Sequence, residues 1–187
     1  LLSIFLAGRE WIAWTPQGFY SCSAQGERLI AWQINAGTVK FPQVHPAARF
    51  RPSMYQPALL KYVVPAGNLP MAMAMAQKYD KALVQTTSVA DVLPPEVTLD
   101  GFTDGTELKM DKDKAALTVK ARATSARHPI TAMRLLVDGR PFNGTAGVKR
   151  FDKAVPNTPT EVTWEVPLLP GSPTVAVIAD TPVSKGM

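Results

Sequence analysis

Residues 10–35 read EWIAWTPQGFYSCSAQGERLIAWQIN, and this stretch decides how the first half of the chain folds. Its large apolar residues come in short groups, separated by turn residues at positions 15–18 (TPQG) and 24–26 (AQG). Short apolar groups between such turns are typical of short β-strands. The stretch also holds three of the four tryptophans and the only cysteine. This stretch is therefore the first candidate both for an aromatic binding surface and for thiol chemistry.

Length and composition predict one large folded domain or two small ones. The chain has 187 residues, of which 46% are hydrophobic, and it contains 17 prolines and 12 glycines. That hydrophobic fraction is sufficient for packed cores, while so many prolines favour short elements over long helices. The net charge of +5 is spread over single basic residues without a basic cluster. We therefore expect no nucleic-acid binding.

An apolar segment, residues 1–8 (LLSIFLAG), precedes the aromatic stretch. A helix needs about 20 apolar residues to cross a bilayer, so this segment is too short. No basic region stands before it, as a signal peptide would require. We expect no membrane association and a cytoplasmic location, with these residues forming a buried β-strand at the cut edge of a fragment.

Residues 41–92 combine prolines with helix-forming segments. Pro57 suits the first turn of a helix, which Pro65 would close. A second helix is predicted over residues 69–83, because Asn68 can cap it and its Met and Ala residues favour helix. Its methionines at positions 71 and 75 share one face with Tyr79, and we expect this face to pack into the core.

A boundary is predicted at Pro94-Pro95, after which apolar and polar residues alternate with the period of a β-strand. Residues 115–124 and 160–168 show this alternation clearly, and Asp138-Gly139 is a strong hairpin signal. Several short strands without helices between them predict an immunoglobulin-like β-sandwich. Its last strand would be incomplete, leaving an exposed edge at residues 174–179 through which the chain could form a homodimer.

The expected fold is therefore mainly β with a small helical connector. Residues 1–92 would form short strands and helices, and residues 93–187 would form the immunoglobulin-like β-sandwich.

Catalytic and metal-binding possibilities are few. Cys22 with His45 or His128 is the only nucleophile–base pair that the composition allows. No protease signature surrounds Cys22, so a structural thiol is the preferred interpretation. One cysteine and two histidines do not supply a zinc site, and the alternating acids Asp111 and Asp113 lack the glycine and glutamate of a helix–loop–helix calcium site. We predict no catalytic residue, no metal and no cofactor.

Five large aromatic residues of the opening stretch are the candidate site, and we refer to them as the aromatic cluster. They are Trp11, Trp14, Phe19, Tyr20 and Trp32. One interpretation is a small β core. The other is a surface that docks on a neighbouring domain, because about 35 residues cannot enclose five such rings unaided.

Several motifs also follow one another in an informative order. Residues 10–35 are followed by FRPSMYQPALL at 50–60, PPEV at 94–97, VDGRP at 137–141 and VPLLPG at 166–171. This order resembles that in large bacterial proteins that couple WD-repeat propellers to a caspase-family protease domain. Within it, Trp32-Gln33 stands where a WD repeat has Trp-Asp.

The resemblance implies a non-catalytic module that links a WD-repeat propeller to a caspase-like effector domain in a bacterial cell. Residues 1–92 would belong to the propeller-associated segment, and the protease's catalytic residues would lie outside this chain. Its partners would be neighbouring domains or a second protein chain. The alternative is a stand-alone protein- or glycan-binding module that uses the aromatic cluster or the sandwich edge. A thiol hydrolase at Cys22 is a third hypothesis.

Overall fold

The computed structural model of the protein describes residues 2–35, 42–79, 88–101, 116–167 and 173–187. The chain divides into two compact units, Leu1–Leu93 and Pro94–Met187, which are described separately. Strands outnumber helices in the described part, so the prediction of a mainly β protein is confirmed. The acidic pair Asp111 and Asp113 lies outside the described residues.

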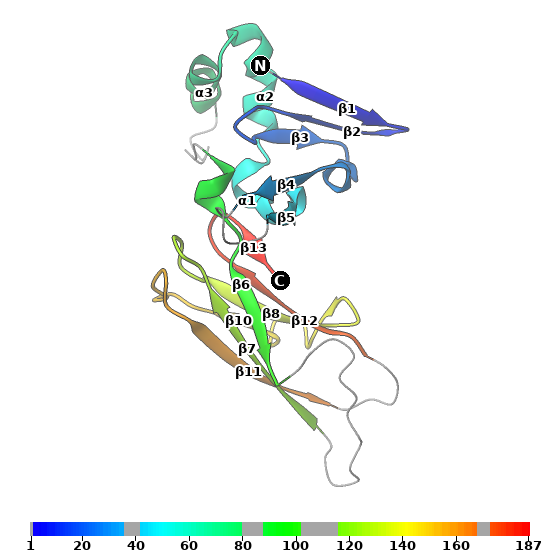
Figure 1. Cartoon of the computed structure of the whole chain (residues 1–187), viewed down its shortest axis with the longest axis vertical. Coiled ribbons are helices and arrows are strands. Elements are labelled where there is room, and N and C mark those ends of the chain that lie inside the picture. The colour runs from blue at the N-terminus through cyan, green and yellow to red at the C-terminus, as the bar shows by residue number, and fades with distance from the viewer. Residues whose placement is uncertain (1, 36–41, 80–87, 102–115, 168–172) are drawn as a thin grey trace. The chain divides into compact units, whose positions relative to one another are not determined.

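The first unit begins with an antiparallel three-stranded sheet in the order β1-β2-β3 (Figure 1). Its strands are β1 (Ser3–Ala7), β2 (Glu10–Trp14) and β3 (Tyr20–Cys22). The predicted turn between β2 and β3 is confirmed, since the Thr15 amide donates to the Phe19 carbonyl and the Gly18 amide to the Thr15 carbonyl, both at 2.9 Å. Gly18 has φ +99°, a conformation that favours glycine.

A second, two-stranded sheet and several short helical turns complete the strand-rich part of this unit. The sheet pairs β4 (Ala31–Ile34) with β5 (Gln43–Pro46). The helical turns are η1 (Gly26–Leu29), η2 (Ala47–Phe50), α1 (Arg51–Met54) and η3 (Val89–Val92). Fully buried apolar side chains from the first sheet and its β2–β3 turn, from η2 and α1, and from the helix α2 (Pro57–Ala66) form the core of the unit, among them Ile12, Phe19, Tyr20, Phe50, Met54, Leu59 and Val63.

Two helices follow, α2 (Pro57–Ala66) and α3 (Leu69–Gln77). Pro57 occupies the first turn of α2 as predicted, but Pro65 does not close this helix. Gly67 ends it instead, by adopting φ +72°, and Pro65 is tolerated because it lies in the last turn. Asn68 caps α3 as predicted, since its Oδ1 accepts the Met71 amide at 2.9 Å.

The predicted end of the second helix was too late, because α3 stops at Gln77; residues 80–83 lie outside the described part. Among the described helices, none combines the length and the apolar content that a bilayer crossing requires.

The face of α3 that is buried is not the predicted one. Ala72 and Ala76 are fully buried, whereas Met71 is 55% exposed and Tyr79 is 80% exposed. The prediction that the methionine face packs into the core was therefore wrong. The helix packs against α2 after the short connection at Gly67-Asn68, and the small alanine side chains permit that close approach.

The second unit contains two antiparallel sheets (Figure 1). The first has the order β11-β7-β6 and the second the order β10-β8-β12-β13, with β9 also paired to β8. The strands are β6 (Glu96–Asp100), β7 (Ala116–Thr124), β8 (Ala132–Val137), β9 (Arg140–Pro141), β10 (Val148–Arg150), β11 (Thr160–Pro167), β12 (Val175–Asp180) and β13 (Lys185–Gly186).

One hydrophobic core is shared by the two sheets of this unit. On β7 and β11 every second side chain is buried, as the alternation predicts. Trp164 is 4% exposed, and its Nε1 donates to the Gly147 carbonyl at 3.0 Å. The other core side chains are Val119, Ala121, Ala123, Ile130, Met133, Leu135, Val162, Val166, Val177 and Ala179.

Two features of the second sheet were predicted, one of them only in part. Asp138 and Gly139 form the hairpin between β8 and β9, with φ +51° and +72° as in a type I′ turn. The exposed edge predicted at residues 174–179 is shorter than expected. On the side of β12 away from β8, β13 covers Ala179 and Asp180, and no other strand of the described chain pairs there.

Candidate functional site

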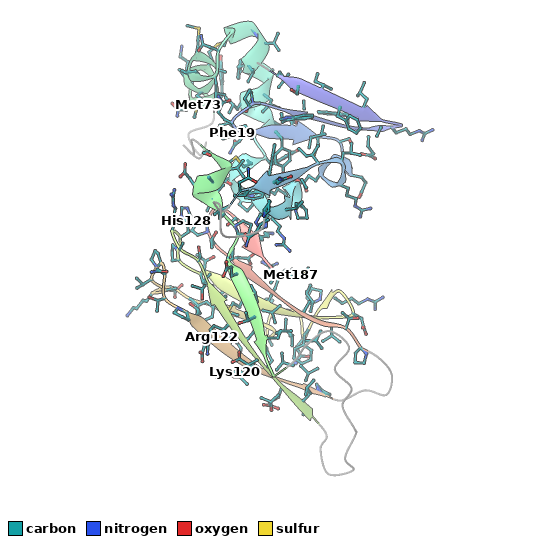
Figure 2. The ribbon with its side chains drawn as sticks, in the orientation of Figure 1. Phe19, Met73, Lys120, Arg122, His128 and Met187 are labelled. Atoms are coloured by element: carbon teal, nitrogen blue, oxygen red, sulfur yellow. The ribbon has the colours of Figure 1, made fainter. Side chains whose placement is uncertain are left out.

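The aromatic cluster is divided between core and surface. Phe19 and Tyr20 are 1% and 0% exposed, and Figure 2 shows Phe19 inside the first unit. Neither side chain can offer area to a docking partner in this structure, because the surrounding core already covers both. Trp14 and Trp32 are half-buried, and Trp11 is 39% exposed. Only the three tryptophans therefore retain surface.

Tyr20 is the centre of a hydrogen-bonded group that we call the Tyr20 network, made of Tyr20, Glu27, Arg51 and Tyr55. The Tyr20 hydroxyl lies 2.7 Å from Glu27 Oε1 and 3.2 Å from the Ala47 carbonyl. Arg51 Nη1 donates to the same Glu27 oxygen at 2.6 Å. The guanidinium also lies over the Tyr55 ring, 4.2 Å from its centroid.

The network joins segments that are distant in the sequence. The rings of Tyr20 and Tyr55 meet edge to face, with centroids 5.6 Å apart, and the Gln56 amide donates to the Tyr20 carbonyl at 2.8 Å. Burial, and secondly the Glu27 carboxylate, raise the pKa of Tyr20 far above its usual value. Tyr20 is therefore a permanent hydrogen-bond donor with a structural role.

Sequence reasoning missed Glu27, Arg51 and a second carboxylate, Glu10. Ser23 Oγ donates to Glu10 Oε2, which also accepts the Gln25 amide at 3.0 Å. These bonds fix the turn after β3, where Gly26 packs against the Trp11 carbonyl without room for a side chain. The only sequence feature that could have pointed to Glu27 and Arg51 is that both lie in motifs that also contain aromatic residues.

The hypothetical nucleophile Cys22 lacks the environment of an activated thiol. Burial, and next the Glu27 carboxylate, raise the pKa of Cys22 above its usual value, whereas a catalytic thiol has a lowered pKa. Cys22 pairs with Ile12 in the first sheet, while His45 pairs with Trp32 in the second, and His128 belongs to the other unit. The described residues contain no group of three potential metal ligands.

We expect Cys22 to react slowly with alkylating reagents. Because its pKa is raised, the thiolate fraction at a given pH is below that of an unperturbed cysteine. Iodoacetamide labelling of the folded chain at pH 7.5, followed by mass spectrometry, should be slower than labelling of the same chain in urea, and it should accelerate only as the pH rises above the usual thiol range. Rapid labelling of the folded chain below pH 7 would contradict this.

The first unit also exposes an apolar strand. The prediction that residues 1–8 form a strand is confirmed by β1, but the prediction that this strand is buried was wrong. Ile4 is 61%, Phe5 48% and Leu6 72% exposed. Pairing with β2 satisfies one side of the strand backbone but leaves these side chains uncovered, because only a layer packed on the sheet or a further strand could cover them.

The outer face of the β11-β7-β6 sheet is charged but internally paired. Lys120 and Arg122 on β7 (Figure 2) lie 3.3 Å and 2.8 Å from the Glu161 carboxylate on β11. Lys120 first, and then Arg122, lower the pKa of Glu161 below its usual value. Since positive side chains are matched by carboxylates across the strands, this face does not present the basic surface that a nucleic acid requires.

Comparison of the chain with protein-family models, curated proteins and solved structures finds no match. Two surfaces qualify as candidate binding sites: the exposed strand β1, and the partly exposed tryptophans of the aromatic cluster.

Proposed function

We propose that the chain is a non-catalytic structural and interaction module that links a WD-repeat propeller to a caspase-like effector domain in the bacterial cytoplasm. The observation that carries the proposal is the apolar surface that the first unit leaves open although it already has a packed core. This surface consists of Ile4 and Leu6 on β1 and of Trp11 on the adjacent strand β2, which lie on one face of the sheet. Contiguous apolar area on a folded unit is typical of a site that another protein segment covers.

The non-catalytic part of the proposal is supported by the state of the reactive groups. The Cys22 thiol has a raised pKa, and Tyr20 is held as a neutral donor. Glu27, the carboxylate that acts most strongly on both, is already engaged by Arg51 and by the Tyr20 hydroxyl. A general base must be able to reach a substrate proton, and this carboxylate is occupied by structural bonds.

We assign the second unit to the immunoglobulin-like sandwiches as part of the same proposal. Its first, second and sixth strands (β6, β7 and β11) form one sheet, and its third, seventh and eighth strands (β8, β12 and β13) belong to the other. An immunoglobulin-type sandwich distributes its strands in this way. One departure is that the buried tryptophan, Trp164, lies on β11 and not on the third strand.

The test is the amino-acid sequence of the natural protein on both sides of residues 1–187. The proposal requires a WD-repeat propeller before this segment and a caspase-like domain with its own catalytic Cys and His after it. Limited proteolysis of that protein should release the propeller and the protease domain as separate fragments. A natural protein that contains neither domain would overturn the linking function.

The stand-alone binding module remains the second candidate, since Trp11, Trp14 and Trp32 keep exposed area. We expect the double variant Trp14→Ala/Trp32→Ala to unfold at lower denaturant concentration, because each replacement removes a half-buried ring at a cost on the order of 1–2 kcal/mol. Urea unfolding measures this, with Tyr79→Ala, at an aromatic residue that is 80% exposed, as the control that changes little. A double variant with unchanged stability that lost binding on a glycan or peptide array would favour the second candidate instead.

A further inference from the structure

The open side of β1 can be identified from the hydrogen bonds of its neighbour β2. The Ser23 amide donates to the Trp11 carbonyl, so the backbone groups of Trp11 point toward β3. In an antiparallel sheet this direction alternates along the strand, and the groups of Glu10, Ile12 and Trp14 therefore point toward β1. Their partners in the register are Ala7, Phe5 and Ser3.

It follows that Ile4 and Leu6 point their amide and carbonyl groups away from β2. No strand in the described part of the chain pairs with that side of β1. The strand SIFLA contains no charged residue, no proline and no glycine. Natural sheet edges are usually protected from pairing by lysine, proline or a bulge, and none of these protections is present in β1.

We propose that β1 pairs with β1 of a second copy of this chain, antiparallel and about a two-fold axis that passes by Phe5. In this register Ile4 of each copy lies opposite Leu6 of the other copy. Every open amide and carbonyl of these two residues then gains a hydrogen-bonding partner. The two Phe5 residues face each other as the non-hydrogen-bonded pair, in which side chains approach most closely.

The second copy is the occupant that this edge fits because the edge is self-complementary. Its two residues with open backbone groups lie symmetrically around Phe5, which is what an isologous two-fold contact requires. The nearest charged side chain, Arg9, lies in the turn beyond β1, so the two copies of Arg9 fall at opposite ends of the paired strands. No like charges are brought together.

Apolar contacts on both faces of the joined sheet favour the same pairing. Phe5 shares its face with its cross-strand partner Ile12, which is fully buried. Ile4 and Leu6 share the opposite face with their partners Ala13 and Trp11. Joining two copies brings together the Phe5 rings on one face and the Ile4 and Leu6 side chains on the other, and aromatic and branched cross-strand pairs stabilise sheets.

The pairing predicts which engineered cysteines can cross-link. In the full chain carrying Cys22→Ser, the variant Phe5→Cys should form a covalent dimer under mild oxidation, because facing residues lie about 4.5–5.5 Å apart. Leu6→Cys is the matched control, since it is more exposed than Phe5 but is offset from its copy by two residues, about 7 Å along the strand, which is too far for a disulfide. Phe5→Cys should cross-link at least about tenfold faster than Leu6→Cys.

A charge on the edge should remove the pairing. Adding Leu6→Lys to the Phe5→Cys/Cys22→Ser chain should abolish the cross-link. Val44→Lys should leave it unchanged, because Val44 is a similarly exposed apolar residue on the separate strand β5. Sedimentation of the unmodified chain should show a concentration-dependent dimer that Leu6→Lys converts to monomer, and this readout does not depend on the cysteine variants folding.

Three results would overturn the proposal: equal cross-linking of Phe5→Cys and Leu6→Cys, a strictly monomeric unmodified chain at high concentration, or a dimer that Leu6→Lys leaves intact. The last result would point to another surface, such as the open part of β12. A monomeric chain would leave the β1 surface available to a neighbouring domain and would not contradict the proposed linking function, which is tested separately by the flanking sequence.

Discussion

Replacement of Tyr20 by alanine is expected to lower the free energy of unfolding by about 3–5 kcal/mol. The substitution removes a ring that is 0% exposed, together with its edge-to-face contact with Tyr55. It also takes a hydrogen-bond donor from Glu27, whose carboxylate then remains partly buried with only Arg51 as its partner. Urea unfolding monitored by circular dichroism measures the loss.

Two control variants separate the contributions of the ring and the hydroxyl. Tyr20→Phe keeps the ring and should cost about 1–2 kcal/mol, the usual effect of a lost buried hydrogen bond. Tyr79→Ala removes a tyrosine that is 80% exposed and should change stability by less than about 0.5 kcal/mol. If Tyr20→Ala were as mild as Tyr79→Ala, Tyr20 would not be a core residue.

Replacement of Trp164 by alanine should lower the free energy of unfolding of the second unit by a similar amount, about 3–5 kcal/mol. Trp164 fills the core between the two sheets, and its indole donates to the Gly147 carbonyl. The alanine variant leaves a cavity and removes one of two donors to the Gly147 carbonyl, the other being the Leu135 amide at 3.4 Å. Thermal unfolding followed by near-ultraviolet circular dichroism reports the loss of packing in this unit.

Thr163 provides the matched control for Trp164. It precedes Trp164 on β11 but points to the opposite, exposed side of the sheet, so Thr163→Ala should leave the midpoint nearly unchanged. The unfolding midpoint of Trp164→Phe should lie between those of Trp164→Ala and Thr163→Ala, because phenylalanine restores most of the side-chain volume without the indole donor. Equal midpoints for Trp164→Ala and Thr163→Ala would refute the shared core.

The strands of the second unit were predictable because each sheet has one buried face. A residue such as Val162 or Trp164 then has to alternate with polar neighbours, and this period of two is visible in the sequence. The Asp138-Gly139 turn was predictable for a related reason, since few dipeptides adopt two consecutive positive φ values. These features depend only on local sequence.

The buried face of α3 could not be predicted in the same way. Its residues alternate between alanine and methionine, so every face is apolar and periodicity does not distinguish them. The position of α2 decides that Ala72 and Ala76 are buried and that Met71 is exposed. The exposure of β1 depends likewise on which elements cover it, a property that the hydrophobicity of Ile4 and Leu6 does not encode.

The Tyr20 network could not be predicted from the sequence either. Arg51 and Glu27 are separated by 24 residues, and no motif rule pairs a carboxylate with an arginine at such a distance. The sequence alone therefore did not decide whether the aromatic cluster forms a core or a docking surface. The fold divides it, because Phe19 and Tyr20 are enclosed while the three tryptophans keep exposed area.

The central claim is this division of the first unit into enclosed and exposed large side chains. Hydroxyl-radical footprinting with peptide mass spectrometry tests it most directly, because it compares residues of one type within the same folded chain. Tyr79 and Met71 should be oxidised rapidly, whereas Tyr20 and Met54, which are 0% exposed, should be protected until the chain is unfolded in urea. Oxidation of Tyr20 and Met54 in the folded chain as fast as that of Tyr79 and Met71 would contradict the account.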